Sequence, residues 1–233
     1  MMLLRKAVAE LIGTAFLVGA VVGSGIMATR LSPGDEGLQL LYNSVATGAV
    51  LVALILTLQP VSAAFNPVVT LLEVALRQVG VRDAAVLVAA QLTGGCLGAD
   101  VANLMFDLDA VSLATTERTG GNLWLSEVVA TLGLLLVVFG AIRSGRTEAI
   151  AFGVGGYITA GYWFTSSTSF ANPAVTVGRT LSDTFAGIAP GSAPMFLLMQ
   201  LVGAGVALGV VLLLYPTLRS DHHLVDHLQE DRT

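Results

Sequence analysis

The chain has few of the side chains on which catalytic and metal sites usually depend. Cys96 is the only cysteine among 233 residues, so an internal disulfide is excluded and a cysteine-based metal site would lack ligands. The three histidines (His222, His223 and His227) all lie in the last twelve residues, which excludes a histidine-based catalytic triad from the rest of the chain. We therefore expect neither an enzyme nor a cofactor. We interpret the histidines as part of a solvated tail, with metal binding as the alternative.

Charge is also scarce. Charged residues make up 12% of the chain, and the net charge of -5 at pH 7 gives no indication of nucleic-acid binding. Hydrophobic residues make up 55%, and the mean hydropathy is +0.80. These values are typical of an integral membrane protein and fit a soluble enzyme poorly.

Six apolar segments are predicted to cross a bilayer, given a helical rise of about 1.5 Å per residue. They cover about residues 7–29, 38–58, 84–106, 123–142, 149–165 and 195–215. Arg5 and Lys6 precede the first segment, so a signal peptide is the alternative interpretation. A signal peptide has a shorter apolar region of about 7–15 residues. Glu10 inside the segment further favours a retained helix that packs in a bundle.

One short motif occurs twice within this apolar sequence. The copies are Phe65-Asn66-Pro67-Val68-Val69-Thr70 and Ala171-Asn172-Pro173-Ala174-Val175-Thr176. Pro suits the first turn of a helix, where its missing N–H costs nothing, and Asn is a preferred N-cap. Each copy therefore predicts a helix start, over about 66–77 and 172–183, in a segment too short to span a membrane. We expect two half-helices whose N-terminal ends meet within the bilayer.

The two motifs belong to a longer internal repeat. The matched pairs are Glu10 with Glu127, Asn66 with Asn172, and Gln91 with Gln200, at offsets of 117, 106 and 109. Each half contains three predicted spans, an odd number, so the second half enters the membrane from the opposite side. The sequence thus predicts an all-α membrane protein with six transmembrane helices and two re-entrant half-helices in an inverted 3+3 repeat.

Basic residues predict the orientation. With a cytoplasmic N-terminus, the residues on the cytoplasmic side are Arg5, Lys6, Arg77, Arg82, Arg143, Arg146, Arg219 and Arg232. Those on the outer side are Arg30, Arg118 and Arg179. Eight basic residues on the cytoplasmic side against three on the outer side favour cytoplasmic N- and C-termini in the inner (plasma) membrane.

The paired motifs and the Glu and Gln pairs, which extend over nearly the whole chain, resemble the aquaporin superfamily, or major intrinsic proteins. The resemblance implies one aquaporin-like channel domain over residues 1–216, with repeats at about 1–106 and 122–216, followed by a cytoplasmic tail over 217–233. It also implies a homotetramer with one pore in each subunit. The implied pore residues are Asn66, Pro67, Val68, Asn172, Pro173 and Ala174. The implied supports of the re-entrant loops are Glu10, Glu127, Gln91 and Gln200.

The departures from the family pattern concern the selectivity filter. Val175 stands where the family normally has Arg, and Ala64 stands where a His usually precedes the first motif. Counting along the repeats gives the other filter positions as Thr47 (or Ala46), Ser169, and Ala160 (or Gly161), all of which are small. This pattern resembles a bacterial subgroup encoded beside arsenic-resistance genes, which implies passage of trivalent arsenite and related neutral solutes.

Other functions stay open at this point. A water-selective or general glycerol channel and a coupled secondary transporter are the alternatives, and a membrane protein with a closed pore is a third. A transporter usually needs ionisable residues within the membrane, and only Glu10 and Glu127 are good candidates. We expect no charged residue in the pore, and the sequence leaves Arg179 open between an outer vestibule and the surface. The aromatic run 162–164 is interpreted as an interfacial belt, with contact to the pore as the alternative.

Overall fold

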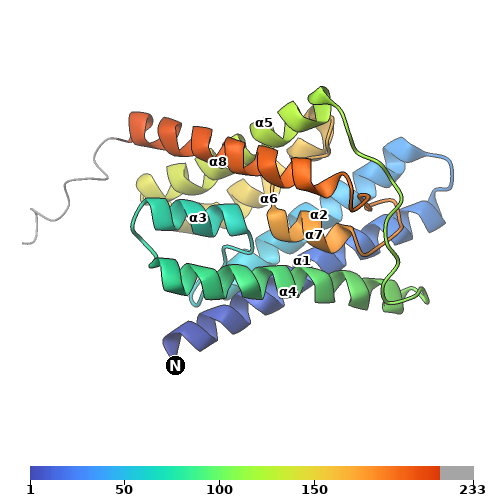
Figure 1. Cartoon of the computed structure of the whole chain (residues 1–233), viewed down its shortest axis with the longest axis horizontal. Helices are drawn as coiled ribbons and strands as arrows, with labels where there is room; N and C mark the ends of the chain where they lie inside the picture. The colour runs from blue at the N-terminus through green and yellow to red at the C-terminus, as the bar shows by residue number, and fades with distance from the viewer. Residues whose placement is uncertain (216–233) are drawn as a thin grey trace, which may run out of the picture.

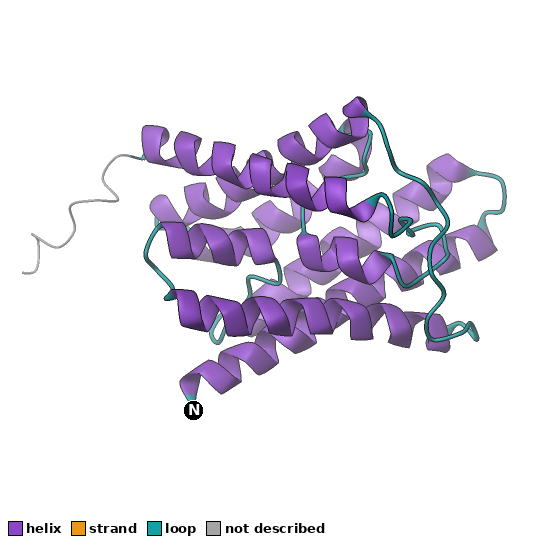
Figure 2. Cartoon of the chain, in the orientation of Figure 1, coloured by secondary structure: helices purple, strands orange, loops and turns teal. Residues whose placement is uncertain are grey.

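The structure is a computed structural model, and it describes residues 1–215, so the predicted tail over 217–233 lies outside the described residues. The described part is helical and contains no strand (Figure 2). The helices are α1 (Met2–Leu31), α2 (Glu36–Leu58), α3 (Pro67–Ala75), α4 (Val81–Met105), α5 (Gly121–Arg143), α6 (Ile150–Phe164), α7 (Pro173–Arg179) and α8 (Ala193–Leu214). A short 3-10 turn, η1 (Thr147–Ala149), precedes α6.

Five helices (α1, α2, α4, α5 and α8) are long and apolar enough to cross a membrane. The remaining predicted span, the fifth along the chain (149–165), corresponds to α6, which has only 15 residues. A helix usually needs about 20 residues to cross the hydrocarbon core. The preceding 3-10 turn lengthens this element, so the predicted arrangement of six helices and two half-helices is confirmed with one short span.

The two halves of the chain pack in the same way. Helix α1 packs against α4 and α2, while α5 packs against α8 and α6, and the contact between α2 and α6 joins the halves. Glycine permits the closest approaches. A Cβ atom at Gly98 would collide with the carbonyl of Ala15, and one at Gly203 would lie 2.7 Å from the carbonyl of Val128. Close packing of this kind suits a membrane bundle, in which small residues let helix backbones approach one another.

The half-helices lie inside the bundle. Figure 1 shows α3 and α7 roughly end to end between α4 and α8, with their N-terminal ends near the middle of the molecule. Helix α7 ends at Arg179, earlier than the predicted end near Asp183. The reason is that the chain after α7 pairs with the loop between the two halves. The Ala114 N–H donates to the Thr180 carbonyl, and the Ser112 N–H donates to the Leu181 carbonyl, both at 2.9 Å.

The N-terminus and the end of α8 lie at the same end of the bundle (Figure 1). The loop 106–120 crosses the opposite end (Figure 1). It is held there by Asn103, whose Nδ2 donates to the carbonyls of Ala110 and Leu181 at 2.9 and 3.1 Å. This loop therefore covers the end of the bundle that is distant from the N-terminus.

Candidate functional site

Each motif asparagine caps its half-helix. The Asn66 Oδ1 atom accepts a hydrogen bond from the Val68 N–H at 3.1 Å, and the Asn172 Oδ1 atom accepts one from the Ala174 N–H at 2.9 Å. A proline follows each asparagine as the first helical residue. The local structure is therefore the one that an Asn-Pro pair favours by itself: a side-chain cap followed by a residue with a preset helical φ.

The two caps also hold each other through a reciprocal clasp. The Asn66 Nδ2 group donates to the Ala171 carbonyl at 2.8 Å, and the Asn172 Nδ2 group donates to the Phe65 carbonyl at 2.8 Å. Each Nδ2 group has two N–H donors, so one N–H on each asparagine remains for another acceptor. The clasp thus fixes two donors at the junction of the half-helices.

The residues before the asparagines have a strained backbone. Phe65 has φ 48° and Ala171 has φ 49°, in the left-handed region that non-glycine residues rarely adopt. This conformation directs their carbonyls to the opposite asparagine, and the two buried glutamates hold the same residues from behind. The strained residues are therefore the two whose carbonyls accept the hydrogen bonds of the clasp.

Glu10 supports the first loop. Its carboxylate accepts hydrogen bonds from the N–H groups of Ala64 at 2.9 Å and Phe65 at 2.7 Å. The Gln91 Nε2 group donates to the same carboxylate at 2.8 Å and to the Thr70 hydroxyl at 2.9 Å. Glu10 is fully buried, and a buried carboxylate is stable only when such donors replace its lost water.

Glu127 repeats this arrangement on the second loop. It accepts hydrogen bonds from the N–H groups of Phe170 and Ala171, each at 3.0 Å. Gln200 donates to Glu127 at 2.7 Å and to the Thr176 hydroxyl at 2.9 Å. The two glutamates and two glutamines named from the repeat therefore occupy matching positions around the clasp.

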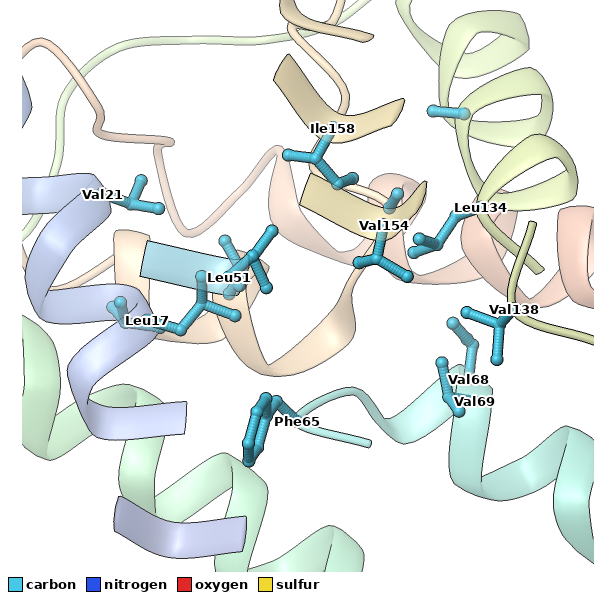
Figure 3. Close-up of a cluster of buried hydrophobic side chains, with 14 of the residues drawn as sticks. Leu17, Val21, Leu51, Phe65, Val68, Val69, Leu134, Val138, Val154 and Ile158 are labelled. Carbon is cyan, nitrogen blue, oxygen red and sulfur yellow. The ribbon is translucent and has the colours of Figure 1, made fainter. Parts of the chain in front are cut away.

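A cavity of about 80 Å³ lies beside the clasp. One part of its wall is apolar and comes from α1, α2, α5 and α6, and Figure 3 shows several of these side chains directed toward a common space. They include Leu17, Leu51, Leu134, Val138, Val154 and Ile158. The polar members of the lining are Thr47, Asn66, Tyr162, Ser169, Asn172 and Arg179. A solute in the cavity therefore meets a few polar atoms within a largely apolar wall.

Three of the predicted filter residues line this cavity. Thr47, Ser169 and Val175 are all buried members of its wall. The Thr47 hydroxyl lies 3.1 Å from the Tyr162 hydroxyl. The Ser169 hydroxyl is buried and has no hydrogen-bond partner within residues 1–215.

The prediction for α6 is wrong. Ala160 is exposed and does not line the cavity. The α6 residues that do are Ile150, Val154, Ile158 and Tyr162, which repeat every four residues along one helix face. Ala160 lies on another face, because two residues along a helix correspond to about 200° of rotation. The four-residue spacing is visible in the sequence, but residues 150–164 are apolar almost throughout, so the spacing alone does not show that this row faces the cavity.

Sequence reasoning also missed Val69. Val69 and Val175 both line the cavity, whereas Val68 and Ala174, which lie one residue closer to the asparagines, are fully buried outside it. The repeat offset of 106 relates Val175 to Val69 directly. The cavity therefore has equivalent valines one helical turn into each half-helix.

The expectation of an uncharged pore is corrected by Arg179. This residue lines the cavity, is only 3% exposed, and donates from Nε to the Ala186 carbonyl. It lies one helical turn after Val175, at the C-terminal end of α7. Among residues 1–215, the only charged side chain in the cavity wall thus comes from the position that the sequence left open.

Two larger cavities adjoin the first at opposite ends. The near mouth, of about 330 Å³, includes Lys6 and Glu73 and shares Ala63 and Ala64 with the central cavity. The far mouth, of about 220 Å³, shares Arg179 with it. The three cavities follow one another past the clasp, an arrangement that suits passage of a solute.

Comparison with known proteins identifies the family. The family model described as Major intrinsic protein matches residues 1–149. The chain belongs to the major intrinsic protein family. A major intrinsic protein with high similarity is "Aquaglyceroporin AqpS" of Rhizobium meliloti (strain 1021), which is 49% identical over 210 residues, or 90% of this chain and 89% of the relative. "Aquaporin-5" of Rattus norvegicus is 30% identical over 74% of this chain and 68% of its own.

A solved major intrinsic protein has the same fold. The X-ray structure of the aquaglyceroporin from Plasmodium falciparum aligns with a TM-score of 0.68, covering 96% of this chain and 99% of that one, at 18% identity. The family match and the 49% identical relative confirm the resemblance to the aquaporin superfamily that the motifs indicated. As a major intrinsic protein, the chain is a membrane channel for small neutral solutes and not an enzyme.

Proposed function

We propose that this channel conducts trivalent arsenite and polyols such as glycerol down their concentration gradients. The observation that carries the proposal is the cavity beside the clasp, which combines a few polar side chains with a largely apolar wall and has Val175 at the position of the family's usual arginine. The 49% identical relative is named an aquaglyceroporin, which supports the polyol part of the proposal.

The chemistry of the solute matches the mixed polar and apolar lining of the cavity. Trivalent arsenite near neutral pH is As(OH)3, an uncharged molecule with several hydroxyl groups, like glycerol. Its hydroxyl oxygens can accept from the remaining N–H donors of Asn66 and Asn172, and its O–H groups can donate to loop carbonyls. These hydrogen bonds offset the loss of water from the solute. The apolar wall adds no further hydrogen bonds, so the solute is not bound too tightly to move on.

The same site disfavours cations. The N-terminal ends of α3 and α7 each correspond to about +0.5 elementary charge, and both meet at the clasp. Together with Arg179 they raise the potential where a cation would have to shed its water. This electrostatic barrier favours neutral solutes.

We assign the two glutamates to support of the loops. All the donors around Glu10 and Glu127 come from loop N–H groups and neighbouring side chains, and neither residue lines the central cavity. This argues against the alternative of a coupled transporter, in which an ionisable residue must meet the solute pathway.

We further infer that the channel is a homotetramer in the inner (plasma) membrane with both termini cytoplasmic. The orientation rests on the excess of basic residues near the N-terminal end of the bundle, and Lys6 lines the near mouth. The assembly is supported by an apolar groove of about 430 Å³ on α1, α2 and α4, which includes Phe16, Val50 and Leu97.

Proteoliposomes without any ion gradient provide the test. Stopped-flow light scattering would measure glycerol and water entry, and elemental analysis of filtered vesicles would measure arsenite entry. We expect glycerol and arsenite entry well above that of protein-free vesicles. Water entry alone would favour the water-selective alternative, and entry that required a proton gradient would favour the transporter.

A further inference from the structure

The far mouth contains two arginines that lie against one aromatic ring. The guanidinium carbon of Arg179 lies 3.4 Å from the centroid of Phe170, and that of Arg118 lies 5.4 Å from it. Phe170 is itself held by an edge-to-face contact with Phe196, with centroids 5.0 Å apart. Both arginines line the far mouth, and Arg179 also lines the central cavity. Two cations thus stand at the entrance to the narrow part of the path.

Backbone carbonyls hold both guanidinium groups in place. Arg118 donates from Nε to the Gly187 carbonyl at 2.9 Å and from Nη2 to the Phe185 carbonyl at 3.4 Å, and Arg179 donates from Nε to the Ala186 carbonyl. Within residues 1–215 neither group forms an ion pair with a carboxylate. The two cations are therefore oriented by neutral partners, and donors of both groups remain for a ligand.

The other charges around the far mouth leave it positive. Glu36 also lines this cavity, but it is exposed and lies in the first turn of α2. Glu127 lies deeper and is occupied by the loop N–H groups and Gln200. Burial lowers the pKa of Arg118 from its ordinary value, yet an arginine remains protonated in the physiological range. Two guanidinium groups face one solvated carboxylate.

An anion that enters the far mouth cannot pass easily beyond it. The central cavity continues between Leu51, Val154 and Val175, which offer no donors to replace the water of a charged solute. Desolvation of an ion is far costlier than desolvation of a hydroxyl. An anion should therefore stay at the arginines and obstruct the entrance.

We propose that the far mouth is a binding site for small oxyanions, held between Arg118 and Arg179, and that bound oxyanion blocks entry of neutral solutes. A guanidinium group presents parallel N–H donors that match the oxygens of a phosphate or carboxylate. The block is an addition to the proposed function, and its flux assay rests on that function.

The test uses the full chain in proteoliposomes and inorganic phosphate as the probe. Glycerol entry is measured with increasing phosphate on both sides of the membrane, against chloride at equal ionic strength, because screening alone weakens exposed charge interactions. Equilibrium dialysis of the detergent-solubilised protein with labelled phosphate measures binding separately. If the protein bound phosphate but did not conduct glycerol, the oxyanion site would be supported and the proposed channel function would be rejected.

The variants are Arg118→Gln and Arg179→Gln, with Arg30→Gln as the matched control. Arg30 also donates to a backbone carbonyl and lies over an aromatic ring, that of Phe106, but it does not line the far mouth. In Arg118→Gln and in Arg179→Gln, loss of a charged hydrogen-bond partner should raise the half-inhibiting phosphate concentration by about tenfold or more. Arg30→Gln should behave like the wild type. Arg118 lies in a loop and is partly solvated, so its variant tests the site even if Arg179→Gln does not fold.

Three results would overturn the proposal. Phosphate could fail to bind or to inhibit more than chloride does. The Arg118→Gln protein could bind phosphate as tightly as the wild type. Labelled phosphate could accumulate in the vesicles at the rate of glycerol, which would mean that the anion passes through the pore instead of blocking it.

Discussion

The substitution Val175→Arg tests the basis of solute selectivity. Val175 is a buried residue of the cavity wall, one helical turn before Arg179. Arginine would replace an isopropyl group by a longer cationic side chain with five N–H donors. The cavity is only about 80 Å³, so the added atoms must occupy much of the space through which a solute passes.

The expected effect on flux follows from desolvation. A polyol forced past a narrower wall must give up hydrogen bonds for at least one hydroxyl, which costs about 1–3 kcal/mol. In the rate this corresponds to roughly a tenfold to hundredfold loss. A water molecule is small enough to exchange partners with the new guanidinium, so we expect water entry to fall much less.

The new charge would also meet Arg179. Side chains one turn apart lie about 6 Å apart, and two like charges at that distance repel by about 3 kcal/mol at an effective dielectric constant near 20. This repulsion should direct the new guanidinium into the cavity and lower the stability of the fold. Size-exclusion chromatography in detergent must therefore precede the flux measurement.

Paired measurements on vesicles with matched protein content provide the assay. Stopped-flow light scattering gives water and glycerol entry, and filtered vesicles give arsenite entry. Val175→Leu is the matched control, because it enlarges the side chain without adding charge or donors and should reduce glycerol entry less. Equal arsenite and glycerol entry in the wild type and Val175→Arg would refute the assignment of selectivity to this position.

Three further predictions concern the clasp and the bundle. Asn172→Leu removes the cap of α7 and the hydrogen bond to the opposite loop, at a cost of about 1 kcal/mol each. The protein should therefore still fold, while glycerol entry should fall by more than about tenfold. Undiminished entry would remove Asn172 from the mechanism. In Glu127→Gln only one oxygen remains to accept from the loop, and the new NH2 group lies against a donor, so stability should fall by about 1–3 kcal/mol. Any change in glycerol entry should be the same at every pH tested, because no transported proton is involved; a pH-dependent loss would contradict the support role. Gly98→Ala should lower the free energy of unfolding in detergent by about 1–3 kcal/mol, because the new Cβ would collide with α1. The control Gly205→Ala, whose Cβ would meet open space, should be neutral or stabilising by up to about 1 kcal/mol. Equal stability of the two variants would refute the packing argument.

The sequence by itself determined the features that depend on the chemistry of neighbouring residues, on the length of apolar segments and on the number of spans in each half. Apolar length identifies the helices, because a bilayer sets the span required. The Asn-Pro pairs define where α3 and α7 begin, because cap and proline act within one turn. The matched Glu and Gln pairs indicate the inverted repeat, since an odd number of spans in each half reverses its direction.

The tertiary structure alone decided which side chains face the path. Ala160 and Tyr162 are two residues apart, yet only Tyr162 lines the cavity, since the rotation of α6 is fixed by its packing against α2 and α5. Arg179 became a pore residue because the chain after α7 turns early and pairs with the loop from the first half. The bonds from Asn66 to Ala171 and from Asn172 to Phe65 join positions more than a hundred residues apart, and no local pattern specifies such a distance.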